Sequence, residues 1–415
     1  MSDWKSVKLG DVAKITMGQS PSSSTYNEFG YGLPFLQGCA DFGPKYPIKK
    51  VYCSDPLKIA ESNSILISVR APVGALNIAD TKYCIGRGLA GILGTSVDQA
   101  FLNYLISANI YKLESQSQGS TFAAINSGDL SNLSLEIPET NETQRTIANI
   151  LSTVDDVIEK TEAAIDKYQA IKAGMMQDLF TRGIDTQTGK LRPTIEEAPE
   201  LYKESELGWI PKGWDATEFK DACLEYINGG TPSTKNASNW VGNIPWITGA
   251  DFLESFEVGF IRRHINEDAL RYSSSHLIRE GNILLVTRTG VGKLAIAPFD
   301  VAISQDITGI ILDPSQYCVE FFYYYLQILV EDFKKMNQGT SINGIIRSDL
   351  EATLILKPPL DEQKQIAAVL KALDETLKKE QSNQSKYHDL KIGLMADLLT
   401  YKVRVIINED KLENS

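Results

Sequence analysis

The sequence is poor in the side chains from which enzymes build reactive centres. Only three histidines are present, His264, His276 and His388, and no two of them have the spacing of a metal-binding pair. The five cysteines are scattered, form no CxxC pair and are odd in number, a pattern that predicts reduced, structural thiols. This inventory predicts neither a catalytic site nor a metal site.

Two short stretches resemble catalytic motifs but do not complete them. Residues 290–293 end like a phosphate-binding loop, yet Thr287 stands where GxxxxGK requires its first glycine. Residues 243–246 approach the NPP(F/Y/W) signature of amino-methyltransferases, but Ile244 replaces a proline and no cofactor-type FxGxG precedes it. We therefore expect no active site in this chain.

The chain also lacks long apolar runs and any excess of basic over acidic residues. The most apolar stretch, residues 321–330, is too short to span a bilayer, and residues 1–10 lack the features of a signal peptide. Both observations favour a cytoplasmic protein with no membrane partner. The formal net charge is −12, and no block of the chain is strongly basic. Because phosphate neutralisation supplies much of the affinity for DNA, DNA binding would need a local basic face or a partner protein.

The chain contains a long helical pattern written twice. The segment from Glu142 to about Thr181 recurs without a gap from Glu362 to Thr400, with identities that include Gln144/Gln363 and Asp155/Asp374. Apolar residues step by alternating threes and fours in both copies, as in the seam of a coiled coil. The predicted helix-packing residues are Leu151, Val154, Ile158, Ile165 and Tyr168 in the first copy and Leu370, Leu373, Leu377, Tyr387 and Leu394 in the second.

Two lysines, Lys172 and Lys391, occupy equivalent positions in these seams. The interpretation we favour from sequence is that each alkyl stem packs in the seam while its ammonium group reaches solvent. The alternative is that they fix the register of the helix pair.

The block before each helix is also repeated. Pro34 to Phe42 matches Pro245 to Phe252, Arg70 matches Arg288, and the Gln-Gly loop at residue 118 matches the one at residue 338. Short β-rich runs separated by Gly, Pro, Asn and Ser predict compact strand-rich domains, with helices near residues 98–113 and 319–336.

Together these patterns predict an α+β chain in which two strand-rich domains alternate with two long helices that pair as an antiparallel coiled coil, a pseudo-twofold internal repeat. The predicted boundaries are a first domain at 1–140, a first helix at 141–181, a linker at 182–211, a second domain at 212–358, a second helix at 359–400 and a tail at 401–415.

Polar loops on the two domains are the candidate binding residues. Their amide, hydroxyl and guanidinium groups can contact base edges or phosphates, although for each residue alone an internal structural role is the alternative. In the first domain the candidates are Ser22, Ser24, Thr25, Tyr26, Arg70, Arg87, Gln118, Ser120, Thr121 and Asn126. In the second domain they are Thr231, Ser233, Lys235, Asn236, Arg288, Gln338, Thr340, Ser341, Asn343 and Arg347.

These features resemble the specificity subunits of type I restriction-modification systems. The resemblance covers nearly the whole chain and rests on the alternation of two domains with two repeated helices, on Trp4 followed by Leu9-Gly10-Asp11-Val12, on the stretch 207–214, on R-x-x-V-G and QG(S/T), and on P-x-x-E-Q at Glu362-Gln363. The first helix departs from the family pattern, because Glu139 to Gln144 contains no match to P-x-x-E-Q, which leaves its starting residue open.

The resemblance implies a non-catalytic subunit that recognises double-stranded DNA. Each domain would be a target-recognition domain reading one half of an asymmetric, interrupted site, while the helices act as a spacer and dock two methyltransferase (modification) subunits. It also implies restriction/translocase subunits as partners. The chain would hold no cofactor or metal, and the complex would use S-adenosylmethionine, ATP and Mg through its other subunits.

Two functions from other classes remain open at this point. A self-contained DNA methyltransferase with a duplicated recognition domain would bind the cofactor as an isolated chain. A repeat adaptor that binds only protein would bind no DNA, with or without a partner.

Overall fold

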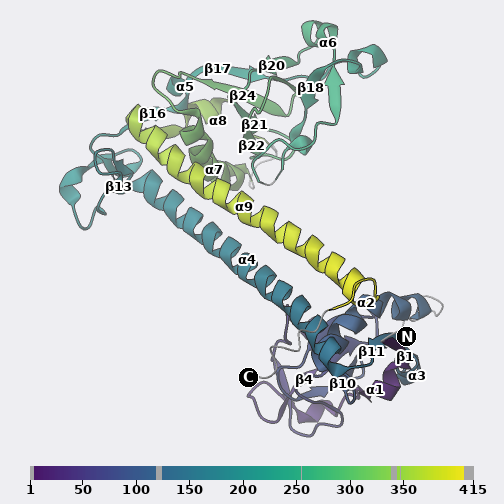
Figure 1. The fold of residues 1–415 in the computed structure, drawn as a ribbon. Helices are drawn as coiled ribbons and strands as arrows, with labels where there is room; N and C mark the ends of the chain where they lie inside the picture. The colour runs from purple at the N-terminus through teal and green to yellow at the C-terminus, as the bar shows by residue number, and fades with distance from the viewer. Residues whose placement is uncertain (1–3, 118–123, 254, 338–343, 346, 406–415) are drawn as a thin grey trace. The chain divides into compact units, whose positions relative to one another are not determined.

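The computed structural model describes residues 4–117, 124–253, 255–337, 344–345 and 347–405 (Figure 1). The chain divides into two compact units, unit 1 comprising Met1–Ala163 with Gln381–Ser415 and unit 2 comprising Ala164–Glu380. The two long helices, α4 (Asn141–Thr181) and α9 (Leu360–Leu398), each contribute residues to both units. Each unit therefore contains one strand-rich domain and part of each long helix.

The described residues of unit 1 form three sheets and, besides the long helices, three α-helices. A two-stranded sheet pairs β1 (Trp4–Lys8) with β11 (Ser134–Pro138). The four-stranded sheet has the order β2 (Ala13–Met17), β10 (Leu89–Gly94), β7 (Ile65–Ser68) and β8 (Leu76–Ile78), and the five-stranded sheet has the order β3 (Tyr26–Asn27), β5 (Val51–Cys53), β4 (Leu33–Leu36), β9 (Tyr83–Ile85) and β6 (Ile59–Ala60). The helices are α1 (Leu9–Val12), α2 (Gln99–Ser117) and α3 (Ser127–Ser131).

Unit 2 repeats this plan. One of its two-stranded sheets pairs β16 (Asp215–Glu218) with β25 (Leu354–Lys357), the counterpart of the β1–β11 sheet. One four-stranded sheet has the order β17 (Cys223–Asn228), β24 (Ile307–Leu312), β21 (Ile283–Val286) and β22 (Leu294–Ile296). The other has the order β19 (Arg263–Ile265), β18 (Ile244–Ile247), β23 (Val301–Ile303) and β20 (His276–Ile278). The helices are α5 (Phe219–Ala222), α6 (Glu267–Tyr272), α7 (Val319–Asn337) and α8 (Arg347–Ala352).

A fully buried strand lies at the centre of each domain. All four residues of β21 are buried, and they alternate between two cores: Ile283 and Leu285 pack in the cluster that contains α7, whereas Leu284 and Val286 pack in the cluster around β23. Strand β7 divides its residues between two cores in the same way. A strand covered on both faces needs a continuous apolar run, which is why these segments lack the alternation of half-buried strands.

The long helices pair antiparallel within each unit. In unit 1, Lys391 bonds to Asp155 and Gln384 to Glu162, so residue numbers fall on one helix as they rise on the other. The predicted seam residues of both helices are all buried or half-buried. The α+β fold class with its antiparallel helix pair is thus confirmed. The pseudo-twofold relation concerns how the two units are placed and stays a prediction.

A buried glutamine anchors each long helix to its domain. Gln144 donates to Pro138 O (2.9 Å) and accepts the Asp98 N–H (2.8 Å). Gln363 makes the same bonds to Pro358 O (2.8 Å) and the Cys318 N–H (2.8 Å). Both side chains are almost fully buried, so these amides satisfy backbone groups that would otherwise lose their hydrogen bonds.

The first long helix begins without the P-x-x-E-Q pattern. Thr140 precedes α4, and its hydroxyl accepts the Thr143 N–H at 3.3 Å, an N-cap that satisfies one of the free donors of the first turn. The starting residue left open by the sequence is Asn141.

The preferred interpretation of the seam lysines is wrong. Lys172 Nζ lies 2.6 Å from Asp374 Oδ1 on the opposite helix, and Lys391 Nζ lies 2.6 Å from Asp155 Oδ1. The ammonium groups do not simply reach solvent, because an aspartate of the partner helix stands within bonding distance. Opposite charges at matching seam positions favour one register, as in the alternative interpretation.

The segment predicted as a linker is folded within unit 2. Strands β12 (Ile184–Asp185) with β13 (Lys190–Leu191), and β14 (Tyr202–Ser205) with β15 (Gly208–Pro211), form two hairpins. Arg192 pairs with Glu362, whose side chain is 1% exposed and also accepts the Ile184 N–H at 2.9 Å. The buried ion pair ties the segment to the first turn of α9.

Candidate nucleic-acid interface

Backbone hydrogen bonds gather the candidate loops of unit 1. The loop after β2 is held by Gly18 N–H donating to Leu89 O (2.8 Å). The end of β7 is held by Val69 N–H donating to Gly88 O (2.9 Å), and the start of the α3 region by Ile125 N–H donating to Val69 O (2.9 Å). The segments that carry Ser22, Arg70, Arg87 and Asn126 are therefore neighbours.

Unit 2 contains the same backbone arrangement. Gly229 N–H donates to Ile307 O (3.2 Å), Thr287 N–H to Asp306 O (2.8 Å), and Ile345 N–H to Thr287 O (2.8 Å). These bonds gather the loop after β17, the end of β21 and the start of the α8 region. The two domains thus present equivalent loop clusters on a shared backbone frame.

Several candidates in unit 1 hold their own loop in shape. Ser22 and Ser24 share a hydrogen bond of 2.9 Å between their hydroxyls, and the Thr25 hydroxyl donates to Ser22 O at 2.8 Å. The Tyr26 hydroxyl donates to Pro21 O (3.0 Å), and its ring stacks on Phe35 with centroids 4.5 Å apart. The Ser22 and Ser24 side chains are exposed, whereas Thr25 and Tyr26 are half-buried.

The two candidate arginines of unit 1 are more available for a ligand than the residues of the Ser22 loop. Arg70 and Arg87 are exposed, and neither has an ion-pair partner among the described residues. Asn126 instead caps α3, because its Oδ1 accepts the N–H groups of Gly128 (2.7 Å) and Asp129 (3.1 Å). Its side-chain NH₂ remains as a donor for a ligand.

The candidates in unit 2 divide in the same way. Thr231 donates to Gln305, and Asn236 caps η4 (Ala237–Trp240) by accepting the Ser238 N–H at 3.3 Å. Arg347 bonds to Glu351 at 2.6 Å and lies over the Tyr226 ring, so its charge is already paired. All six of these described candidates are exposed, and Ser233, Lys235 and Arg288 are the three whose side chains form no such internal bond among the described residues. Gln118, Ser120, Thr121, Gln338, Thr340, Ser341 and Asn343 lie outside the described residues.

The loop clusters also contain polar residues that the sequence did not single out. Ser20 Oγ accepts the Arg87 N–H (3.3 Å) and bonds to the Gln37 side chain (3.2 Å), which connects three loops of unit 1. In unit 2, Gln305 takes the position of Arg87 and bonds to Thr231. Arg87 was already a candidate, and aligning the two repeats pairs it with Gln305, which is the signal that could have identified Gln305.

A basic cleft of about 650 Å³ lies beside the candidate loop of unit 2. It is lined by Thr234, Trp240, Val241, Gly242, Arg262, Arg263 and His264. Arg262 is anchored there by Asp251, with Nε 2.5 Å from Oδ1. Burial opposes the charge on Asp251, but the hydrogen bonds from Arg262 and Thr248 outweigh it and lower the pKa of this carboxyl.

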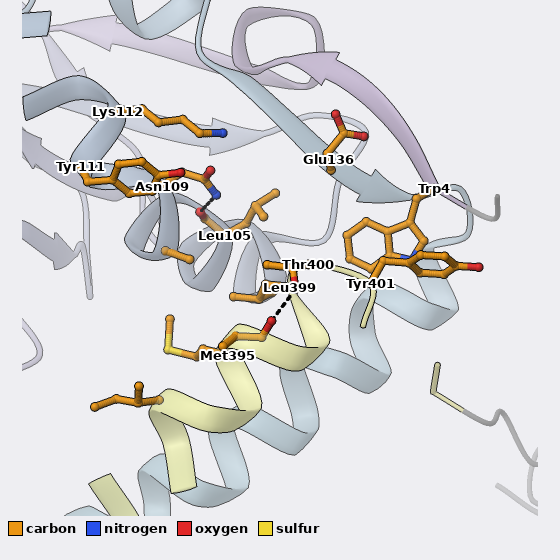
Figure 2. Close-up of a pocket in the computed structure, with 13 residues that line it drawn as sticks. Trp4, Leu105, Asn109, Tyr111, Lys112, Glu136, Met395, Leu399, Thr400 and Tyr401 are labelled. Atoms are coloured by element: carbon orange, nitrogen blue, oxygen red, sulfur yellow. Dashed lines mark hydrogen bonds between the residues drawn. The ribbon is translucent and has the colours of Figure 1, made fainter. Parts of the chain in front are cut away.

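Unit 1 has an apolar groove of about 680 Å³ between α2, the β1–β11 sheet and the last turns of α9 (Figure 2). Trp4 and Tyr401 line it, with ring centroids 5.7 Å apart. In unit 2 the positions of Leu399 and Leu105 hold Phe180 and Tyr325, which stack at 5.3 Å and are buried. The groove is therefore a packing difference between the two repeats.

The described residues contain no group of three or more His, Cys, Asp or Glu side chains placed to hold a metal ion. The cysteines of this part of the chain are unpaired thiols, and burial raises the pKa of Cys84 to about 12, which disfavours a reactive thiolate. None of the described helices combines the length and apolarity needed to cross a membrane.

Comparison with known proteins identifies the same family in both units. The family model described as type I restriction modification DNA specificity domain matches residues 1–167 and 211–386. A putative type I restriction enzyme MjaX specificity subunit from Methanocaldococcus jannaschii is 44% identical over 190 residues, which cover 45% of this chain and 44% of that protein. The MjaIX specificity subunit of the same organism is 31% identical over 222 residues, covering 51% and 50%. The chain thus spans about half the length of these two relatives.

Longer matches are more distant. The MjaVIII specificity subunit, also from M. jannaschii, is 23% identical over 440 residues, covering 97% of this chain and 93% of that protein. Among solved structures, the type I restriction-modification S subunit from M. genitalium superimposes with a TM-score of 0.63 at 14% identity, covering 95% and 96% of the two chains. This structural similarity establishes the fold.

Proposed function

Because this chain belongs to the family of type I restriction modification DNA specificity domains, we propose that it is the DNA sequence-recognition subunit of a type I restriction-modification complex. The observation that carries the proposal is the pair of equivalent loop clusters, which share a backbone frame but differ in their exposed side chains. Two different readers on one frame would recognise an asymmetric, bipartite site.

The shared backbone arrangement suggests that different residues of each loop cluster contact phosphates and bases. Arg70 and Arg288 follow equivalent strands, are both exposed, and have no ion-pair partner among the described residues. A residue shared by both readers suits a phosphate contact, because phosphates carry no sequence information. The aligned pair Arg87 and Gln305 differs between the two domains. An arginine at this position can donate two hydrogen bonds to guanine, whereas a glutamine can form a bidentate pair with adenine.

The proposed domain boundaries are those of the sequence analysis, with recognition domains at 1–140 and 212–358 and spacer helices at 141–181 and 359–400. The helices would dock two methyltransferase subunits, and restriction subunits would complete the complex. We propose a cytoplasmic location for the assembly.

The chain itself would be non-catalytic. S-adenosylmethionine, ATP and Mg would act through the partner subunits, as the resemblance to specificity subunits implies. A self-contained methyltransferase would require cofactor binding by the isolated chain, which calorimetry with S-adenosylmethionine can measure directly; we expect none.

The test of the proposed function compares duplex binding by the isolated chain with binding by its complex with methyltransferase subunits. Because the chain carries a net charge of −12, we expect tight, sequence-specific binding only in the complex at ~150 mM salt. A complex that forms but binds no DNA would favour the protein-only adaptor.

A further inference from the structure

Arg263 on β19 lies against two tryptophans that contact each other. Its guanidinium carbon lies 5.7 Å from the ring centroid of Trp240 and 5.8 Å from that of Trp246. The two indoles meet edge to face, with centroids 5.0 Å apart and an interplanar angle of 87°. Such contacts hold a guanidinium electrostatically and limit the positions it can adopt.

The same tryptophans hold the candidate recognition loop. Trp246 Nε1 donates to Gly230 O (3.2 Å), and Trp240 Nε1 donates to Ser233 O (3.3 Å). The loop that carries Thr231, Ser233 and Lys235 is therefore fixed to the elements that position Arg263. Loop and guanidinium form one preorganised surface at the basic cleft.

The donors of Arg263 are available for a ligand. Its side chain is exposed and has no hydrogen-bond acceptor or ion-pair partner among the described residues. Its neighbour Arg262 is different, because its Nε donates to Asp251 and its Nη2 donates to Thr248. The cleft thus presents one structural arginine and one arginine whose fork of N–H donors faces no internal acceptor.

The two repeats differ at this position. Strand β19 pairs with β18 so that Arg263 lies opposite Trp246, and β5 pairs with β4 so that Val51 lies opposite Phe35, the counterpart of Trp246. If Arg263 made a phosphate contact that both domains need, we would expect a basic residue at the equivalent position of unit 1, which is Val51. A cation found in one reader suits a base contact, and a planar fork of donors matches the O6 and N7 acceptors of guanine.

We infer that Arg263 reads a guanine in the half-site recognised by unit 2. This inference rests on the proposed function and assigns one base-reading residue within it. Arg263 would donate two hydrogen bonds to O6 and N7 in the major groove, while Trp240 and Trp246 hold the guanidinium in place.

The experiment uses the complete methyltransferase complex and a duplex library randomised across both half-sites, with methylated products identified by sequencing. For Arg263→Ala we expect discrimination at one G·C pair of one half-site to fall by about 5- to 150-fold. Discrimination in the other half-site should be unchanged. Arg263→Gln should shift the preference at that pair from guanine towards adenine, since glutamine pairs with adenine.

Arg271→Ala is the matched control, because Arg271 is also exposed in unit 2 and contacts only the ring of Tyr272 among the described residues. Its sequence preference should equal that of the wild type. A uniform loss of methylation across all sequences would make Arg263 a phosphate contact and overturn the inference, as would an unchanged preference. If Arg263→Ala lowers the unfolding midpoint, the change of base preference from guanine towards adenine in Arg263→Gln tests the inference instead.

The outcomes separate this inference from the proposed function. A wild-type complex without sequence preference would contradict the proposed function itself. A wild-type complex that recognises a bipartite site, with Arg263 variants that recognise the same site, would overturn only the role of Arg263.

Discussion

The Lys172 ammonium group lies 2.6 Å from the Asp374 carboxylate, and this carboxylate also accepts a hydrogen bond of 2.8 Å from the Tyr324 hydroxyl. Lysine from one long helix, aspartate from the other and tyrosine from the domain helix thus meet at one point of unit 2. Unit 1 repeats the arrangement with Lys391, Asp155 and Tyr104. The triad joins the helix pair to the domain and fixes their register.

Lys172 and Asp374 should stabilise the helix pair jointly, so that replacing both costs less than the sum of the two single replacements. In a double-mutant cycle of Lys172→Met and Asp374→Asn, we expect a coupling energy of about 1 kcal/mol, since the pair is partly buried and charge-assisted. Urea unfolding measures it. Lys167→Met, an exposed position on the same helix, is the control and should change stability by about 0.5 kcal/mol or less. A coupling energy near zero would contradict the role in register.

The triad tyrosines should titrate at unusually high pH. Burial, together with the hydrogen bond to aspartate, raises the pKa of both Tyr104 and Tyr324 well above 10. A raised pKa means that this stabilisation is fully present below pH ~10, the pKa in the unfolded chain, and is lost as the pH rises through the higher folded value. Other buried tyrosines also have raised pKa values, so absorbance titration at alkaline pH should show that the Tyr104→Phe and Tyr324→Phe variants each lose one of the tyrosines that ionise only with unfolding. Ionisation of both near pH 10 in the folded protein would refute this.

The folded segment between the repeats should depend on Glu362. Replacing it with Gln removes the charge opposite Arg192, which is itself largely buried, and should cost about 3 kcal/mol. The control is Asp215→Asn, which breaks the exposed pair of Lys203 and Asp215 and should cost less than about 1 kcal/mol. Equal losses in the two variants would show that the segment is not fixed to α9 through this pair.

The shared arginines should act without regard to sequence. Replacing Arg70 or Arg288 with Ala should weaken binding of the complex to all duplexes to a similar degree and reduce the slope of log affinity against log salt by about 1. Binding measured at several salt concentrations tests this. A loss confined to one base pair would instead make the affected arginine a base reader.

Sequence reasoning located the long helices because a seam depends only on local spacing. It identified Gln144 and Gln363 as equivalent, but their shared role depends on backbone groups of other elements, Pro138 and Asp98 in the first case. It misjudged Lys172 because the seam pattern does not reveal which partner residue will stand opposite. That the segment between the repeats is folded was also missed, because its buried anchor, Glu362, is distant in sequence.

For the candidate interface, the sequence did not reveal which atoms of the candidate loops are available for a ligand. Asn126 and Asn236 looked like donors and acceptors for bases, yet their Oδ1 atoms cap local helices. Arg263 was not singled out because its significance comes from two tryptophans that only the strand pairing brings together. Polar residue types predict a polar surface, whereas availability depends on tertiary contacts.

The central claim is that the chain contains two independent DNA readers. The most direct measurement is a map of methylated adenines across the host genome, first with this chain and then with residues 1–140 exchanged for the corresponding block of another specificity subunit. We expect a bipartite site whose half-site centres lie roughly 10 bp apart. The exchange should change one half-site and leave the other intact. A change in both half-sites, or in neither, would contradict the account.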